Sequence, residues 1–393
     1  MRKLGHAEAI DKRLHLLKYH LPYHKSDHIL NFAYNALCNG TSLDEIELRR
    51  NDVVFLGADR IPDPSTAGDF CRRFTPDYVE ALQDIFDQTR VKVWKQQPPD
   101  FFDEAVIDAD GSLVATNTGC KQGIDIAHDG IWGYHSLIVL SANTGEELSI
   151  INRSGNRPSH EGAAEQIDLA ILLCRSAGFR HIFVRGDTDF TQTKQLDAWD
   201  AKAVTFLFGI DAMANLQAIA EGRPASDWAE LQRRPQYTAK GKLRERPERV
   251  KDRIVRERGY KTLTRVREVA YRPTACRRTY RLIIVRQGIK VEEGQRRLFD
   301  EIRYRFYLTN DREAAPRALV FKANGRCDQK NLIAQLKGGV QALRAAVDNL
   351  VSNWAYMVMT APAWNPKAWF ALSGPEHPRH KEAHRCRWSS SRS

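Results

Sequence analysis

The chain has 393 residues, 42% of them hydrophobic, with a formal net charge of +11 and a sequence pI of about 9.3. No run of about 18 apolar residues occurs, and the N-terminus lacks an apolar core and a cleavage site, so neither a membrane span nor a signal peptide is expected. The length predicts two or three compact units of roughly 150 residues. The positive charge points first to nucleic acid, with a well-solvated basic protein as the alternative.

The seven cysteines are widely spaced and form no CxxC pair. An odd number at such spacings predicts neither a zinc site nor a disulfide framework. We therefore expect a reducing compartment, the cytosol.

Residues 1–99 are predicted to form a helical domain. One helix is expected over residues 28–37, after the capping residues Ser26 and Asp27. A longer helix opens at Pro76, because proline is favoured in the first turn. Such a domain can bind DNA ends, or it can serve as a structural cap on the domain that follows.

Residues 100–222 have the pattern of an α/β core, in which short apolar runs predict strands and longer runs predict the helices between them. The expected elements are strands at 104–110, 134–142 and 147–152, a helix at 161–177, a strand at 180–186, a helix at 191–200 and a strand at 204–210. Three antiparallel strands followed by alternating helices and strands are typical of a ribonuclease-H-like fold. Several other α/β folds begin in the same way.

Residues 223–320 break this alternation and are strongly basic. Positions 231 to 290 hold 20 Lys and Arg against 5 Asp and Glu, interleaved with strand-like runs. We expect a basic β-rich insertion that contacts DNA phosphates without specifying sequence, with Arg277, Arg278 and Arg281 among its cations. The alternative is a solvated antiparallel sheet whose exposed faces happen to be basic.

Residues 321–372 return to a helical pattern, with helices expected over 327–338 and 340–359. An apolar stripe on the second helix indicates core packing. The last segment, 373–393, is polar and basic without an apolar period, which predicts disorder.

Two aspartates stand out by their context. Asp110 ends the apolar run that begins at residue 104, and Asp187 follows the run that begins at residue 180. Sites in α/β sheets form at the carboxyl ends of strands, so we expect the two side chains at one site. Two adjacent carboxylates repel unless cations lie between them, and a pair of Mg²⁺ or Mn²⁺ ions would allow phosphoryl transfer there. The alternative is that Asp110 belongs to a common Asp-Gly turn and Asp187 is a cap.

The sequence resembles the DDE transposases of bacterial insertion sequences, in the group with a β-rich insertion between the second Asp and the final Glu. The likeness spans roughly residues 20–372 and is carried by IPDPSTAGDFCRRF, DADGS, GYHSLIVLSANTGE, NRSGNRPSHEGA, RGDTDF and the final helix. That group shows Tyr, two residues, Arg, three residues, Glu, six residues and Lys on this helix. Arg326 and Lys337 match the Arg and Lys, whereas Ala323 and Lys330 occupy the Tyr and Glu positions.

The resemblance implies two-metal-ion cleavage of the element's ends, followed by attack of a 3′-hydroxyl on target DNA. Asp110 and Asp187 would bind metal, with Asp108 as an alternate for Asp110, and Arg326 and Lys337 would hold the scissile phosphates. The implied partners are double-stranded DNA, as terminal inverted repeats and target, and a second copy of the chain in the synaptic complex. A membrane is not among them, and the implied location is the bacterial cytoplasm.

Lys330 is the departure that matters for chemistry. An ammonium group has only donors and cannot ligate Mg²⁺, and it places a positive charge where the metal should sit. Asp328 lies about 200° around the helix from it and is a poor substitute, and Gln329 is neutral.

Three functions are consistent with this pattern. The first is an active transposase. The second is a DNA-binding remnant that recognises element ends without cutting, which Lys330 favours. The third is a ribonuclease-H-like nuclease without transposition, which is disfavoured by the basic insertion and by the spacing of Arg326 and Lys337.

Overall fold

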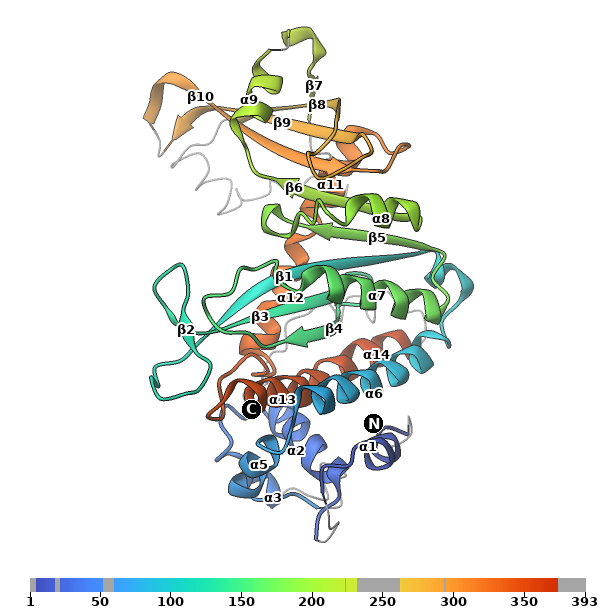
Figure 1. Ribbon diagram of the computed structural model, residues 1–393, viewed down its shortest axis with the longest axis vertical. Helices are drawn as coiled ribbons and strands as arrows, with labels where there is room; N and C mark the ends of the chain where they lie inside the picture. Colours follow the sequence, from blue (N-terminus) through green and yellow to red (C-terminus); the bar gives the residue numbers. More distant parts are fainter. Residues whose placement is uncertain are drawn as a thin grey trace, which may run out of the picture. The chain divides into compact units, whose positions relative to one another are not determined.

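The computed structural model describes residues 5–17, 22–51, 60–222, 224–231, 262–292 and 295–373. The chain is a mixed α/β protein that divides into two compact units, Met1–Arg185 with Arg326–Ser393, and Gly186–Gly325 (Figure 1). Much of the predicted basic run, residues 232–261, and the predicted disordered tail after residue 373 lie outside the described residues.

The first unit begins with helices whose starts follow local capping rules. Asp63 caps α5 (Pro64–Cys71) by accepting a hydrogen bond from the backbone N–H of Thr66 at 2.9 Å. Proline occupies the first turn of α5, at Pro64, and of α6 (Pro76–Trp94), at Pro76. The predicted helices at 28–37 and from Pro76 are both present. The helices are α1 (His6–Arg13), α2 (Lys25–Leu37), α3 (Ile46–Arg50), α5 (Pro64–Cys71) and α6 (Pro76–Trp94).

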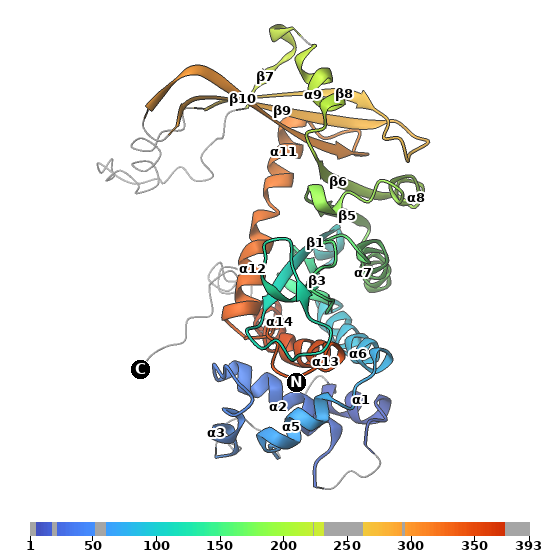
Figure 2. The ribbon, with the colours of Figure 1, turned by 60° about the vertical axis from the view of Figure 1, so that its left-hand side comes forward.

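The sheet of the first unit has four strands in antiparallel ladders and one parallel strand. β3 pairs with β1 on one edge and with β2 and β4 on the other, and β5 runs parallel to β1 on the far side of β1 (Figures 1 and 2). α7 (Ala163–Ala177) joins β4 to β5 and ends at Gly178, whose φ of 112° suits glycine. The strands are β1 (Glu104–Ala115), β2 (Asp125–Ile126), β3 (Trp132–Ser141), β4 (Glu146–Ile151) and β5 (His181–Gly186).

The prediction that the first strand ends at Asp110 is wrong. Asp110 pairs with Ile138 and Gly111 with Leu137, and the ladder continues to Ala115. Asp-Gly makes no turn here because β3 supplies an antiparallel partner along this whole stretch. Asp110 is therefore held in the middle of a paired strand, which fixes its position more firmly than a loop would.

The C-terminal part of the first unit supplies α12 (Cys327–Gly338), α13 (Leu350–Thr360) and α14 (Asn365–Ser373). The first matches its predicted bounds, but the predicted helix at 340–359 begins ten residues late. Asn349 caps α13 by accepting from the Ser352 backbone N–H at 2.8 Å, and residues 340–349 are irregular, although half of them are buried. The core of this unit joins α12 and α13 to the N-terminal helices and to one face of the sheet.

The second unit is built on an antiparallel sheet in the order β6-β10-β9-β8-β7. The predicted helix at 191–200 is shortened to α8 (Leu196–Ala201), and a 3₁₀ turn over Thr188–Phe190 precedes it. The elements are α8 (Leu196–Ala201), β6 (Val204–Ile210), α9 (Ala214–Glu221), β7 (Ala229–Glu230), β8 (Thr262–Tyr271), β9 (Tyr280–Glu292), β10 (Gln295–Thr309) and α11 (Pro316–Asn324). Among the described residues, no helix combines the length and apolar character needed to cross a membrane.

A buried carboxylate on β4 connects the sheet of the first unit to α6 and α14. Glu146 of β4 is fully buried and accepts hydrogen bonds from Arg90 (3.1 Å) and Trp94 (2.9 Å) of α6 and from Trp369 (2.6 Å) of α14. Arg90 is buried too, and it also pairs with Asp87. A buried charge is tolerated only when it is paired and hydrogen-bonded, so these contacts hold α6 and α14 against β4.

We predict that Glu146→Gln lowers the free energy of unfolding by about 3 kcal/mol, because it leaves the buried Arg90 with an incomplete partner set. Urea unfolding followed by tryptophan fluorescence measures this loss. Glu47→Gln is the matched control: Glu47 pairs with Arg50 on the surface, and we expect less than about 1 kcal/mol. Equal losses in the two variants would contradict the role given to Glu146.

Candidate active site

Asp110 meets a cation from the C-terminal part of the chain. Its carboxylate Oδ2 lies 3.6 Å from Nη1 of Arg326, the residue that precedes α12, and both side chains are mostly buried. Its Oδ1 accepts from the backbone N–H of Gly111 at 2.9 Å. The sequence-predicted pair Asp110 and Arg326 is therefore brought together within the first unit, although 216 positions separate the two residues.

Asp108 lies two residues earlier on β1 and is bound by an arginine that sequence reasoning missed. Both of its carboxylate oxygens accept from Arg185 of β5, at 2.7 Å from Nε and 2.6 Å from Nη2. The two residues are register partners in the parallel ladder. Burial raises the pKa of Asp108, an effect that Arg185 and Arg326 oppose and that Asp328 reinforces. An arginine at the end of a buried apolar strand was the available signal for this pair.

The helix α12 presents a second cation to β1. Nζ of Lys337 donates to the backbone oxygen of Leu113 at 2.8 Å, and burial lowers the pKa of Lys337 while Asp110 opposes that shift. Lys330 is exposed on the same helix. It follows Arg326 by four residues and precedes Lys337 by seven, so all three lie within about 40° of one another around the helix.

The neighbours of Lys330 on α12 are not equivalent. Gln329 is buried, and neither its side-chain oxygen nor its nitrogen has a hydrogen-bond partner among the described residues. Asp328 is exposed, and its charge raises the pKa of Asp108. The only acid of this first helical turn therefore acts electrostatically on the Asp108–Arg185 pair.

Asp187 belongs to the second unit and comes directly after β5, as predicted. It caps the following 3₁₀ turn, and its side chain accepts from the Asp189 backbone N–H at 3.2 Å. Along the chain it follows Arg185 by two residues, as Asp110 follows Asp108.

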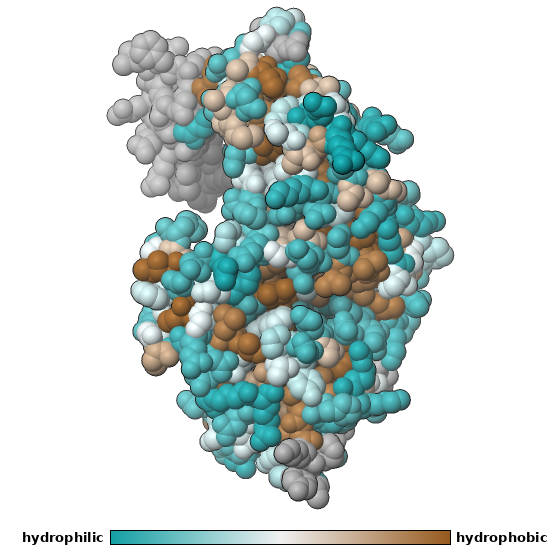
Figure 3. All heavy atoms as spheres, viewed as in Figure 1, coloured by the Kyte–Doolittle hydropathy of each residue, from teal (hydrophilic) through white to brown (hydrophobic). Residues whose placement is uncertain are grey.

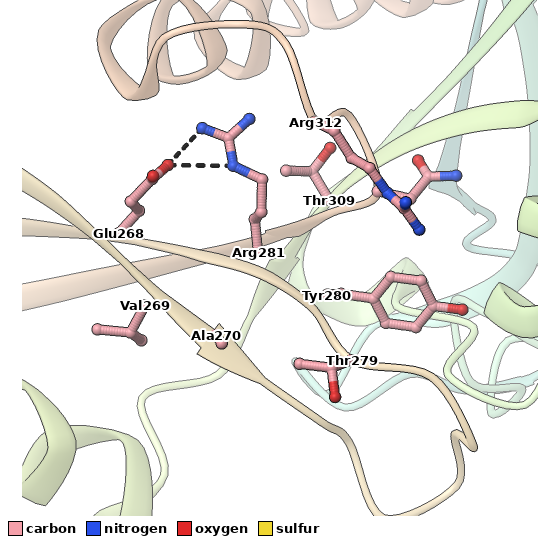
Figure 4. Close-up of a pocket in the computed structure, with 9 residues that line it drawn as sticks. Glu268, Val269, Ala270, Thr279, Tyr280, Arg281, Thr309 and Arg312 are labelled. Atoms are coloured by element: carbon pink, nitrogen blue, oxygen red, sulfur yellow. Dashed lines mark hydrogen bonds and ion pairs between the residues drawn. The ribbon is translucent and has the colours of Figure 1, made fainter.

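The three predicted DNA-contacting arginines of the second unit differ in their contacts. Arg277 is exposed, and its backbone N–H donates to Asp197 at 2.6 Å. The Arg278 side chain pairs with Asp200. Arg281 lines a cavity of about 500 Å³, where its Nε donates to Glu268 at 3.0 Å and its Nη1 to the backbone oxygens of residues 311 and 314 (Figure 4).

A family model described as transposase DDE domain group 1 matches residues 1–386. The chain belongs to this family. No curated protein matches its sequence. Among solved structures, a piggyBac transposase synaptic complex with hairpin DNA is similar at 11% identity and a TM-score of 0.38, over 97% of this chain and 80% of that one.

DDE transposases generally use divalent metals such as Mg²⁺. Such ions require several carboxylate or other oxygen ligands close together. Within the described ranges, no three His, Cys, Asp or Glu side chains gather closely enough to hold an ion. The charged side chains beside Asp110 are those of Arg326 and Lys337, which have only hydrogen-bond donors and cannot ligate a metal ion. The described residues of the first unit therefore fall short of a two-ion site.

We predict that Arg185→Ala destabilises the chain in a pH-dependent way, because it leaves Asp108 buried without its cation. The folded pKa of Asp108 then lies further above its unfolded value, near 4. Protonation of Asp108 contributes fully to the free energy of unfolding below the unfolded pKa, and this contribution is lost as the pH rises through the folded pKa. We expect a loss of about 3–5 kcal/mol in the free energy of unfolding at pH 8 and a smaller loss near pH 5.

Urea unfolding across this pH range measures the effect. The double variant Asp108→Asn/Arg185→Ala is the control, since it has no carboxyl group to titrate and should lose the added pH dependence. A loss for Arg185→Ala that is the same at pH 5 and pH 8 would show that Asp108 is not the responsible group.

Proposed function

We propose that the chain is a DNA transposase with a ribonuclease-H-like core formed by residues 100–222 and 321–372. The strand order β4-β3-β1-β5, antiparallel except for the last pair, supports this fold. The observation that carries the assignment of the site is that Arg326 and Lys337 both contact β1, at Asp110 and at the Leu113 oxygen. Position 330 lies between them on the same side of α12.

In this proposal Asp110 and Asp187 are two of the three acids that would bind a pair of Mg²⁺ or Mn²⁺ ions. Asp108 can replace Asp110 only by giving up Arg185, which engages both of its oxygens. Lys330 stands where the third acid is required, and its charge opposes metal binding. We therefore propose that this copy binds element ends and does not cut them.

The proposed partner is double-stranded DNA, both the terminal inverted repeats and the target, bound by a dimer in the synaptic complex. Residues 1–99 and the insertion at 223–320 would contact it, with Arg277, Arg278 and Arg281 on phosphates. The proposed setting is the cytoplasm of a bacterium, where chromosomal DNA is accessible. A nuclease without transposition is the weaker alternative, and strand transfer of a 3′-hydroxyl end distinguishes the two.

We predict that Lys330→Glu gains Mg²⁺- or Mn²⁺-dependent cleavage of the DNA ends that flank the coding sequence, whereas the natural chain has none. The substitution removes a cation and adds a carboxylate ligand between Arg326 and Lys337. Lys330→Gln is the matched control, because it removes the charge without supplying a ligand, and it should stay inactive. Cleavage and strand transfer are scored on labelled DNA in a sequencing gel.

The same assay identifies the other acids. Adding Asp110→Ala or Asp187→Ala to Lys330→Glu should abolish the gained cleavage. Robust cleavage by the natural chain would show instead that another residue completes the site, and inactivity of Lys330→Glu would remove the assignment of position 330.

We predict that Arg277→Ala weakens binding to DNA of any sequence and reduces the slope of log K against log salt concentration by about 0.9, the contribution of one phosphate contact. Fluorescence anisotropy over a range of KCl concentrations measures both effects. Arg281→Ala is the comparison: its guanidinium is also engaged by Glu268, so besides reducing the slope it should lower the stability of the second unit, which Arg277→Ala should not. An unchanged slope for Arg277→Ala would remove this residue from the DNA surface.

A further inference from the structure

A groove lies between α6 and α7 in the first unit, away from the candidate active site. It has a volume of about 940 Å³ and is floored by β4 and Trp354. The helices α6 and α7 themselves are drawn in Figures 1 and 2. Its α7 wall carries two leucines that face solvent, Leu169 at 58% and Leu172 at 61% exposure. Hydrophobic side chains gather over α7 on this face in Figure 3. Neighbouring exposed leucines beside a groove are typical of a contact surface.

The α6 wall of the groove has an ordered charge pattern. Five of its lining residues, spaced by about one helical turn, run from acidic through neutral to basic, while a further lining acid, Asp87, is paired with the buried Arg90 within the copy. The five are Glu80, Asp84, Gln88, Lys92 and Lys95. The pattern reverses its sign about Gln88, and it extends over about 22 Å at 1.5 Å per residue.

The fold of one copy gives little reason for this order. Like charges one turn apart, as at Glu80 and Asp84, destabilise a helix by about 0.2–0.5 kcal/mol, whereas alternating signs would stabilise it. The helix dipole favours Lys92 and Lys95 near the C-terminal end of α6. It does not account for the acids, which lie beyond the first turn, where the dipole effect has faded. Arg13 lies 3.9 Å from Asp84, and the Asp84 side chain is still 70% exposed.

We propose that this α6–α7 face binds the same face of a second copy of the chain around a two-fold axis at Gln88. Two α6 helices in antiparallel contact place Asp84 opposite Lys92 of the second copy and Glu80 opposite its Lys95. The same axis places the exposed leucines of each α7 against those of the other copy's α7. Such an interface is isologous, because the same patch of each copy faces its counterpart. The charge order fixes the antiparallel direction, and the apolar contact supplies the burial.

Charge reversal tests the pairing without DNA, on the full chain by sedimentation velocity. The natural chain is expected to form dimers that weaken as salt is raised. Glu80→Lys/Asp84→Lys makes the stripe basic throughout, and Lys92→Glu/Lys95→Glu makes it acidic throughout. Each variant alone should dimerise at least tenfold more weakly. An equimolar mixture should recover 1:1 dimers, and the fourfold variant with all signs exchanged should recover homodimers.

Two leucine substitutions distinguish an effect at this surface from a general effect of an added surface charge. Leu172→Arg should weaken the dimer, whereas Leu48→Arg, at a leucine of α3 that is 57% exposed and outside the groove, should not. A natural chain that stays monomeric, or a dimer that ignores the charge reversals, overturns the proposal. So does a mixture that pairs no better than its components, since this would show that the groove takes another partner. Because no DNA is present, none of these outcomes bears on cleavage.

Discussion

The bidentate ion pair between Asp108 and Arg185 is the contact on which the candidate site depends. Both charges are buried, at side-chain exposures of 2% and 8%, so neither can be lost without leaving the other unpaired in the core. The pair joins register partners of adjacent parallel strands and therefore opposes any slip between β1 and β5. A slip of one residue would turn Asp110 to the opposite face of its strand.

The position of α12 against β1 is independent of the residue at 330. Arg326 and Lys337 make the polar contacts to β1, and buried apolar side chains such as Leu336 make the packing contacts. Lys330 is exposed and takes part in neither. Substitutions at such positions usually change stability by less than about 0.5 kcal/mol. The fold therefore imposes no constraint that would keep an acid at position 330, and only the chemistry of the site does.

Sequence patterns predicted the elements that have strong local signals. The bounds of β6 and α12 match because an apolar run and a periodic helix are properties of the segment itself. The extension of β1 past Asp110 was missed because it depends on pairing with β3, a contact between distant parts of the chain. The late start of α13 was missed because apolar periodicity was given more weight than the capping residue Asn349.

The candidate site shows the same division between local and non-local information. The four- and seven-residue spacings that group Arg326, Lys330 and Lys337 were available from the sequence, and the context of Asp110 led to its proposal as a site residue. Arg185 could not be proposed in the same way, because the sequence does not show the partner of an arginine in a strand until the register of β1 and β5 is known.

The partner of Asp108 decides what Asp108 can do. Because a guanidinium holds both of its oxygens, its geometry is that of a positioning residue. In the proposed site Asp110 is thus the acid of β1 that is assigned to the metal. Arg326 then has two effects, since it compensates the charge of Asp110 while no metal is bound and competes with any ion for the same carboxylate. A third acid on α12 would shift that competition toward the metal, and Lys330 shifts it toward the arginine.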